Sequence, residues 1–195
     1  MQIASNDDKL LKETKKILSS RFEMTDMGQV HHILGLQIQY EKGKKLTIDQ
    51  SHYTEKILER FGMKNCNPIS TPADNYTHLR AYQDEDQDTV LMDNTRYRSA
   101  VGALMYLAIA TRPDIAFAVN RVARFVERPT ITHWTAVKRI MRYLRGTTNC
   151  GLVFEKKDKE TNNLKAYCDS DWAGDLDDRK STTGFVLILN DSIIS

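Results

Sequence analysis

Two carboxylates spaced two residues apart are the side chains of this sequence best suited to hold a metal ion. Asp169 and Asp171 continue the alternation of residues 164–168, so both would face the same way if a strand ran through them. Neighbouring carboxylates repel one another and are tolerated best in water or around a cation. The pattern therefore indicates either a cation site or a solvated acidic turn after a strand.

The same stretch resembles the start of a calcium-binding loop, with Gly174 at the sixth position, but its ligand spacing does not fit. Such a loop needs oxygen ligands at the fifth and twelfth positions counted from Asp169, with a bidentate Glu at the twelfth. Ala173 and Lys180 occupy these positions. We therefore expect no calcium site.

Two strands would position this acidic stretch. Residues 164–168 alternate between apolar and polar or aromatic side chains, and residues 185–189 are five consecutive apolar residues. The second run is too short for a globular helix and predicts a buried strand. We expect the two strands to pair as a hairpin.

Composition bounds the class of protein but says little about its partners. The formal net charge is +2, from 28 basic and 26 acidic residues, and 41% of the 195 residues are hydrophobic, which suffices for one or two domains with a core. The three cysteines have no C-x-x-C spacing and indicate reduced thiols. The longest apolar run, residues 101–110, is about half of what a bilayer requires. We expect an intracellular protein, cytoplasmic or nuclear and not secreted, with no membrane or small-molecule partner.

The first third of the sequence predicts a helix, a hairpin and a second helix. Apolar residues recur at helical spacing up to Phe22 after a capping stretch at residues 5–8. Strict alternation then predicts a hairpin over residues 34–48. Ser51 is the expected cap of the second helix, which Gly62 ends. Residues 66–94 lose periodicity, hold six acids against one base, and predict an acidic linker.

From residue 96 to 148 the charge balance inverts, with ten basic residues against two acids. We expect three helices: a buried one over residues 99–110, one beginning at Pro113, and one capped by Thr132 and ended by Gly146. Trp134 is expected in the core, and the five histidines have no ligand-like spacing and are interpreted as incidental. Two basic faces are expected on the second and third helices: Arg121, Arg124 and Arg128 on one, and Lys138, Arg142 and Arg145 on the other. Such faces suit a phosphate backbone, although basic helix faces are also common as solvated surface.

The run Y-C-D-S-D-W-A-G-D-L-D-D-R-K-S-T-T-G, residues 167–184, resembles the opening of the ribonuclease H domain in copia-type retrotransposon Pol polyproteins. Residues 3–7, 34–38, 51–62 and 70–72 resemble the reverse transcriptase of the same polyproteins. The resemblance covers nearly the whole chain. It implies that Asp169 matches the first metal-binding aspartate of that family and that residues 185–189 form the second strand of its sheet.

This resemblance implies an α+β fold in four segments. Residues 1–65 would be a residual palm and thumb segment of reverse transcriptase, built as helix, β-hairpin and helix. Residues 66–95 would be the acidic linker, and residues 96–148 a three-helix basic thumb or connection region. Residues 149–195 would be the truncated start of a ribonuclease H-like fold, with its first β-hairpin.

The expected function follows from the same resemblance. The paired polymerase aspartates of the family would stand before residue 3, and its remaining ribonuclease H carboxylates after Ser195, so we expect a fragment without catalytic activity. The intact family enzyme would use Mg²⁺ or Mn²⁺. No cofactor is expected for the fragment, and Asp169 would hold metal only in a complete domain. The expected partner is the backbone of an RNA/DNA duplex, bound weakly and without sequence preference. The alternatives are a non-catalytic nucleic-acid-binding module using the basic helices of residues 113–146, and a host-adopted interaction protein.

Overall fold

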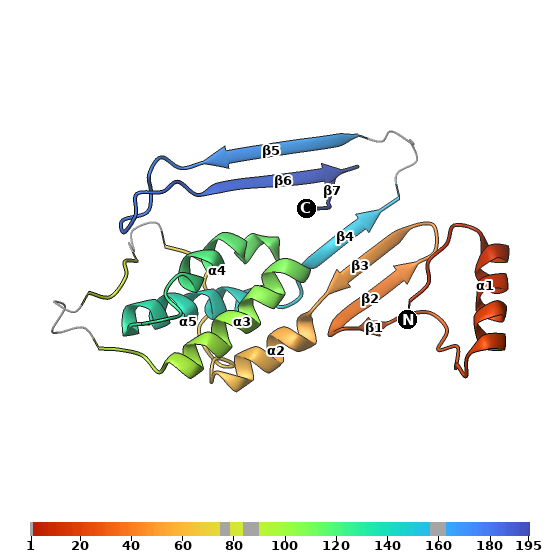
Figure 1. Ribbon diagram of the computed structural model, residues 1–195, viewed down its shortest axis with the longest axis horizontal. Helices are drawn as coiled ribbons and strands as arrows, with labels where there is room; N and C mark the ends of the chain where they lie inside the picture. The colour runs from red at the N-terminus through yellow and green to blue at the C-terminus, as the bar shows by residue number, and fades with distance from the viewer. Residues whose placement is uncertain (1, 75–78, 84–89, 157–162) are drawn as a thin grey trace.

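The computed structural model describes residues 2–74, 79–83, 90–156 and 163–195. It is a mixed α+β structure in which a group of helices lies beside two small antiparallel sheets (Figure 1). The α+β class predicted from the sequence is therefore confirmed. The elements in chain order are α1 Asp8–Arg21, β1 His32–Ile33, β2 Leu36–Glu41, β3 Lys45–Asp49, α2 Ser51–Arg60, α3 Asn94–Ala110, the 3-10 helix η1 Pro113–Ile115, α4 Ala116–Ala123, α5 Ile131–Gly146, β4 Gly151–Glu155, β5 Leu164–Ser170, β6 Thr183–Leu189 and β7 Ser192–Ile193.

The hydrophobic core lies between α2, α3, α4 and α5. Helix α3 is apolar nearly all round and contributes the fully buried Leu104 and Leu107, as expected for the central helix. It begins at Asn94, five residues before the predicted start, because Asp93 accepts a hydrogen bond from the Thr95 backbone N–H and caps it. The predicted core position of Trp134 is confirmed by its burial.

The first sheet has the strand order β1-β2-β3-β4, with every neighbouring pair antiparallel. The predicted hairpin is confirmed as β2 and β3, joined by a turn in which Gly43 has φ +75°. Strand β4 follows α5 and pairs with β3, with Gly151 opposite Asp49. A Cβ at Gly151 would lie 2.5 Å from the Ile48 carbonyl oxygen, so the close approach requires glycine. The segment expected to start a ribonuclease H-like fold at residue 149 therefore begins with β4, which belongs to the first sheet.

The second sheet has the order β5-β6-β7. The predicted hairpin is confirmed, with Cys168 opposite Phe185 and Asp169 opposite Gly184. The predicted burial of the second strand is wrong, because none of its residues is buried: Phe185 and Val186 are exposed, and residues 187–189 are half-buried. Every residue of β5 is exposed as well.

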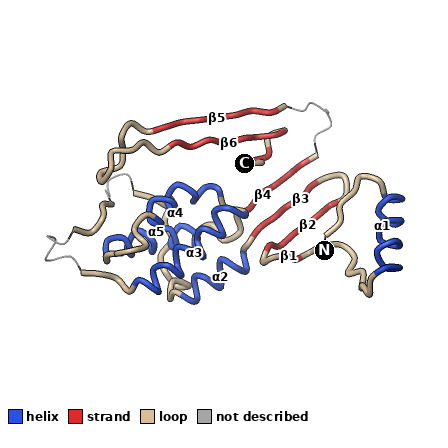
Figure 2. The backbone as a smooth tube through the Cα atoms, viewed as in Figure 1, coloured by secondary structure: helices blue, strands red, loops and turns tan. Residues whose placement is uncertain are grey.

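Helix α1 lies at one end of the molecule, away from the other helices and from the loop that joins β5 to β6 (Figure 2). The prediction of a capped helix is confirmed, since the Asp7 carboxylate accepts the Lys9 backbone N–H at 2.8 Å. Its apolar side does not reach the core, and Leu10 and Ile17 are each more than half exposed. The stripe that predicted this helix is therefore not buried: Leu11 and Leu18 are only partly covered, and no residue of α1 is buried.

Two helix boundaries differ from those expected in the basic region. Helix α4 ends at Ala123, so the face expected to continue along residues 124–128 does not form. Helix α5 is capped by Thr130 and not by Thr132. The reason is a reciprocal capping box in which the Thr130 hydroxyl accepts the His133 N–H and the His133 ring accepts the Thr130 N–H.

A buried arginine holds the corner between α3 and η1. Arg112 is 2% exposed, and its Nε and Nη2 donate to the Asp114 carboxylate at 3.0 and 2.8 Å. Its Nη1 donates to the backbone oxygen of Thr147, at the end of α5, at 2.8 Å. The Tyr143 hydroxyl donates to the same carboxylate at 2.8 Å. The buried guanidinium is therefore paired and hydrogen-bonded, as burial requires.

The protonation of Asp114 follows from these contacts. Burial raises the pKa of the Asp114 carboxyl, but the hydrogen bonds from Arg112 and Tyr143 outweigh burial and hold that pKa below its usual value. A carboxyl with a lowered pKa stabilises the fold above its ordinary pKa and loses this contribution as the pH falls through the lowered value. The pair therefore stabilises the fold at neutral pH.

Replacing Arg112 should destabilise the fold more than replacing a surface arginine. Arg112→Met removes the buried guanidinium with its bonds to the exposed Asp114 carboxylate and to the Thr147 carbonyl, and we expect the free energy of unfolding to fall by about 1–3 kcal/mol. Arg21→Met, at the exposed end of α1, should change it by less than about 0.5 kcal/mol. Urea denaturation followed by circular dichroism measures both. Equal, small losses in the two variants would contradict the structural role of the pair.

Candidate nucleic-acid interface

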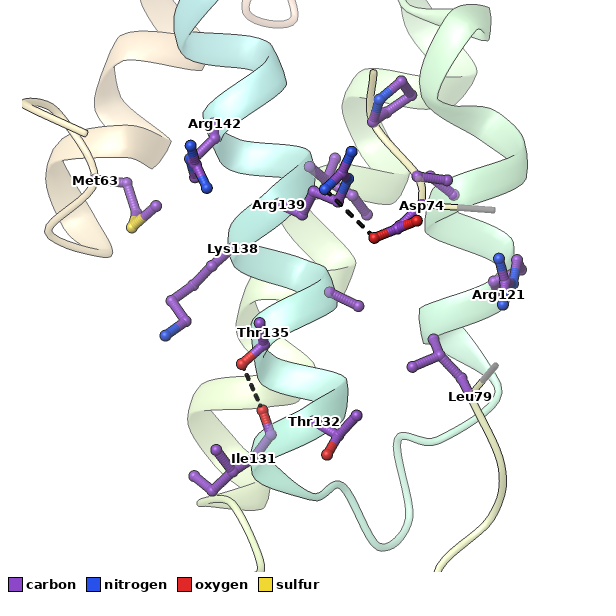
Figure 3. A pocket seen from close by; sticks show the side chains of 15 residues that line it. Met63, Asp74, Leu79, Arg121, Ile131, Thr132, Thr135, Lys138, Arg139 and Arg142 are labelled. Atoms are coloured by element: carbon purple, nitrogen blue, oxygen red, sulfur yellow. Dashed lines mark hydrogen bonds and ion pairs between the residues drawn. The ribbon is translucent and has the colours of Figure 1, made fainter. Parts of the chain in front are cut away.

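A pocket of about 640 Å³ opens between α5, α4 and the segment after α2 (Figure 3). Four basic side chains line it: Arg121 from α4, and Lys138, Arg139 and Arg142 from α5. Asp74 is the acidic residue among its lining residues. Helices α4 and α5 thus bring cations from two separate stretches of sequence to one concave surface.

The pocket gathers half of the residues predicted to contact nucleic acid. Arg121, Lys138 and Arg142 line it, whereas Arg124, Arg128 and Arg145 do not. Arg139 was not among the residues predicted to contact nucleic acid, although it is a basic residue of the same helix. In Figure 3 Lys138 and Arg142 lie on one side of α5, and Arg139 lies on the other, toward Asp74.

The arginines of α5 also fix the segment that leads away from α2. Arg142 Nε donates to the Asn67 carbonyl and Arg145 Nε donates to the Lys64 carbonyl, each at 2.8 Å. Arg139 Nη2 donates to the Thr71 hydroxyl at 2.9 Å. A guanidinium carries five N–H donors, so these bonds leave donors for a further acceptor. The residues therefore position the wall of the pocket as well as charging it.

Arg139 also lies near an acidic side chain, that of Asp74. Its Nη1 lies 3.7 Å from the Asp74 carboxylate. Lys138, by contrast, makes no hydrogen bond or ion pair with any of the described residues. Its ammonium group is therefore the unpaired cation of this surface within the described part of the chain.

Arg124 and Arg128 are engaged with other segments. Arg124 forms an ion pair with Asp175 and lies 3.9 Å from a carboxylate oxygen of Asp178, both in the loop between β5 and β6. The guanidinium of Arg128 lies over the ring of Tyr82, 4.5 Å from its centroid. A role for either in nucleic-acid binding stays a prediction, but the continuous arginine face expected on the second helix is wrong because α4 ends at Ala123.

The two aspartates that suggested a cation site do not face one another as a pair. Strand β5 ends at Ser170, and Asp169 accepts the Ser170 backbone N–H at 2.9 Å. Asp171 lies beyond the strand and accepts the backbone N–H of Thr182 across the loop. Among the described residues no group of three or more His, Cys, Asp or Glu side chains could hold a metal ion. The donor set in the described part of the chain therefore does not fit Mg²⁺ or Mn²⁺ on its own.

His133, interpreted from the sequence as incidental, supports the start of α5. It is buried, its Nδ1 accepts the Thr130 N–H at 3.0 Å, and its Nε2 donates to the Arg80 carbonyl at 2.9 Å. Its ring stacks on Phe125 with 4.1 Å between centroids. The interpretation as incidental is wrong for this histidine. The spacing T-x-x-H is the signal that could have identified it, since the third helical residue commonly completes a capping box.

These features define the class of protein as an α+β chain with a cationic, partly apolar pocket between helices. The described part of the chain has no carboxylate cluster that could bind a metal ion. A family model described as "Reverse transcriptase (RNA-dependent DNA polymerase)" matches residues 1–75. The chain belongs to the family of reverse transcriptases of copia-type retrotransposon Pol polyproteins, which confirms the resemblance found in the sequence.

The similarity to curated relatives extends over nearly the whole chain. It is 45% identical to the Retrovirus-related Pol polyprotein from transposon TNT 1-94 of Nicotiana tabacum, in a match that covers 100% of this chain and 15% of that protein. It is 42% identical to the polyprotein from transposon RE1 of Arabidopsis thaliana, covering 99% of this chain and 13% of that one. The uncharacterized mitochondrial protein AtMg00810 of Arabidopsis thaliana is 43% identical, with 91% and 70% covered.

The chain thus spans 13–15% of the length of the Pol polyproteins it matches. No solved structure matches it. A search of the described helices finds none with the length and apolar character that crossing a membrane requires.

His133 makes the stability of α5 depend on pH. Burial lowers the pKa of His133, so the fold favours the neutral ring. Its contribution to stability is complete above the ordinary histidine pKa and declines as the pH falls from about 7 to about 5. His133→Gln retains an acceptor for the Thr130 N–H but cannot titrate. We expect thermal unfolding of the variant to lose less stability than the wild type over this range, and parallel losses would contradict the role of the buried ring.

Proposed function

We propose that this chain is a nucleic-acid-binding part of a copia-type Pol polyprotein, and that it contacts the phosphate backbone of an RNA/DNA duplex through α4 and α5. The observation that carries the proposal is that Arg121 from α4 and Lys138, Arg139 and Arg142 from α5 line one pocket. Arg145 extends the same side of α5 by a further turn. Family membership supports it, because a reverse transcriptase works on a nucleic-acid template.

The chemistry of these side chains suits a backbone and not a base sequence. Guanidinium groups offer forked donors that match phosphate oxygens, and their binding releases counterions from the nucleic acid. Affinity should therefore depend steeply on salt and little on sequence. The competing explanation is that these basic side chains are ordinary solvated surface charges. Measuring the binding of charge-reversal variants distinguishes the two explanations.

We further propose that the second sheet corresponds to the start of a ribonuclease H-like fold, with Asp169 near the end of its first strand. Two-metal hydrolysis requires several carboxylates around the ions. Asp169 would contribute to such a centre only together with acidic residues other than those this sheet supplies. We propose accordingly that these 195 residues by themselves neither extend a primer nor cleave RNA.

Reversing two surface arginines should weaken duplex binding. Arg142 and Arg145 both hold the segment after α2, so the better pair is Arg121 with Arg145, which spares one of these two anchors. Arg121→Glu/Arg145→Glu should reduce affinity for a blunt RNA/DNA duplex at least about tenfold at low salt and flatten the salt dependence by about 2 in slope. Fluorescence anisotropy at several salt concentrations measures both quantities.

The matched control carries the same change of charge elsewhere. Lys12→Glu/Lys16→Glu lies on α1, away from the pocket, and should leave affinity nearly unchanged beyond the small effect of net charge. Circular dichroism should be the same for all three proteins. Equal weakening by the two double variants would return Arg121 and Arg145 to the class of solvated surface charges.

The proposal about catalysis is tested with the purified chain in Mg²⁺ and in Mn²⁺. We expect no extension of a labelled primer and no cleavage of the RNA strand above the level of buffer, because the required carboxylates are not assembled. Activity that disappears in Asp169→Asn would overturn this expectation. Activity that persists unchanged in Asp169→Asn would come from a contaminating nuclease or polymerase.

A further inference from the structure

The loop between β5 and β6 carries aspartates that contact residues outside the second sheet. Asp175 forms an ion pair with Arg124, and its side chain is only 5% exposed. Asp177 accepts the backbone N–H of Ala81, with its two carboxylate oxygens 2.9 and 3.1 Å from that nitrogen. Residues 175–178, the acidic loop, therefore join the second sheet to the end of α4 and to the segment before α3 (Figure 1).

Hydrogen bonds within the acidic loop hold its carboxylates in place. Asp175 Oδ1 accepts the backbone N–H of Asp177 at 2.7 Å and that of Asp178 at 3.1 Å, while its Oδ2 faces Arg124. Asp178 accepts the Lys180 backbone N–H and pairs with the Lys180 ammonium group at 2.7 Å. An Asp178 carboxylate oxygen also lies 3.9 Å from the Arg124 guanidinium. A short turn thus presents two carboxylates to one guanidinium.

The guanidinium of Arg124 is the group for which nucleic acid would compete with this loop. Arg124 directly follows α4 and stands three residues after Arg121, which lines the cationic pocket. Carboxylates and phosphates offer a guanidinium the same kind of anionic oxygen acceptor. The Arg124 side chain is 42% exposed, so a phosphate can approach it from solvent while Asp175 is still in place.

We propose that the acidic loop is an intramolecular competitor of nucleic acid: it occupies Arg124 in the free protein, and a phosphate backbone bound along α4 and α5 displaces it. The inference rests on the proposed duplex binding and adds a regulation of the same surface. Displacement of the loop also breaks the hydrogen bond between Asp177 and Ala81, because both contacts belong to one short turn. Binding of nucleic acid therefore loosens the attachment of the second sheet to the helical region.

Removing one carboxylate of the acidic loop should raise affinity for the duplex. Asp175→Asn keeps a side-chain oxygen that can accept the two N–H groups of the turn, but it removes the charge that pairs with Arg124. A competing loop that is closed about nine times in ten lowers the apparent affinity about tenfold. We expect the variant to bind a blunt RNA/DNA duplex about three- to tenfold more tightly than the wild type at low salt, as measured by fluorescence anisotropy.

Two controls separate competition from a change in net charge. Asp26→Asn removes an aspartate that is paired with Lys15 of α1, away from this surface, and should change affinity by less than about twofold. Arg124→Gln removes the group that is competed for, so adding Asp175→Asn to it should give no further gain. A gain that persists in the Arg124→Gln background, or that Asp26→Asn reproduces, would overturn the inference.

Hydrogen exchange of the Ala81 amide reports the position of the acidic loop in the wild-type chain. Because Asp177 accepts this N–H in the free protein, the amide should exchange at least about threefold faster once the duplex has displaced the loop. A duplex that only covered the surface would not speed this exchange. Unchanged or slower exchange at Ala81 in the bound protein would therefore overturn the inference.

The outcomes distinguish this inference from the proposed function. Failure of both the wild type and Asp175→Asn to bind the duplex overturns the proposed function, and the competition with it. Binding of the duplex with equal affinity by the two proteins overturns only the inference.

Discussion

The ion pair between Arg112 and Asp114 is the interaction on which the helical region depends. It joins the end of α3 to η1 and, through the Thr147 carbonyl and the Tyr143 hydroxyl, to the last turn of α5. The neighbouring Thr111 hydroxyl donates to Gln50 Oε1 at 2.8 Å, which links the same corner to the start of α2. Three helices are thus fixed relative to one another around the buried Arg112 guanidinium, which needs the Asp114 carboxylate because it is itself removed from water.

The arrangement of the basic surface follows from that corner. Helix α4 begins directly after η1, and Thr147, the residue that follows α5, accepts a hydrogen bond from Arg112. The angle between α4 and α5 is therefore set at the ion pair of Arg112 with Asp114. This angle places Arg121 on the side of α5 toward which Arg139 points (Figure 3), and both residues line the pocket. At the other end of α5, the capping box of Thr130 with His133 fixes where the helix begins, and hence which side chains face the pocket. The contacts at the two ends of α5 therefore determine which of its basic side chains line the pocket.

Much of the secondary structure could be predicted from the sequence because it depends on local patterns. Alternation of apolar residues predicted the β2–β3 and β5–β6 hairpins, and helical spacing predicted α1, α2, α3 and α5. Two caps were predicted wrongly, because Ser51 and Thr132 lie inside α2 and α5. The tertiary contacts could not be predicted in this way. Thr111 to Asp114 reads as a break between helices, and nothing local reveals that Arg112 is buried against Thr147, 35 residues further on. The pairing of β4 with β3 likewise joins residues separated by a hundred positions.

The site was predictable in part for the same reason. The basic side of α5 follows from helical spacing, but Arg124 is occupied by Asp175, a residue of a loop far along the chain. An apolar run such as residues 185–189 predicts a buried strand only if a cover is present, and cover is a property of the surrounding fold.

The central claim is that nucleic acid lies on the surface formed by α4 and α5. Chemical modification of arginines in the wild-type chain, with and without a blunt RNA/DNA duplex, followed by mass spectrometry of the peptides, tests it most directly. We expect the duplex to protect Arg121 and Arg145 and to leave Arg21 at the end of α1 as reactive as in the free protein. Unchanged reactivity of Arg121 and Arg145 under conditions in which the duplex is bound would contradict it.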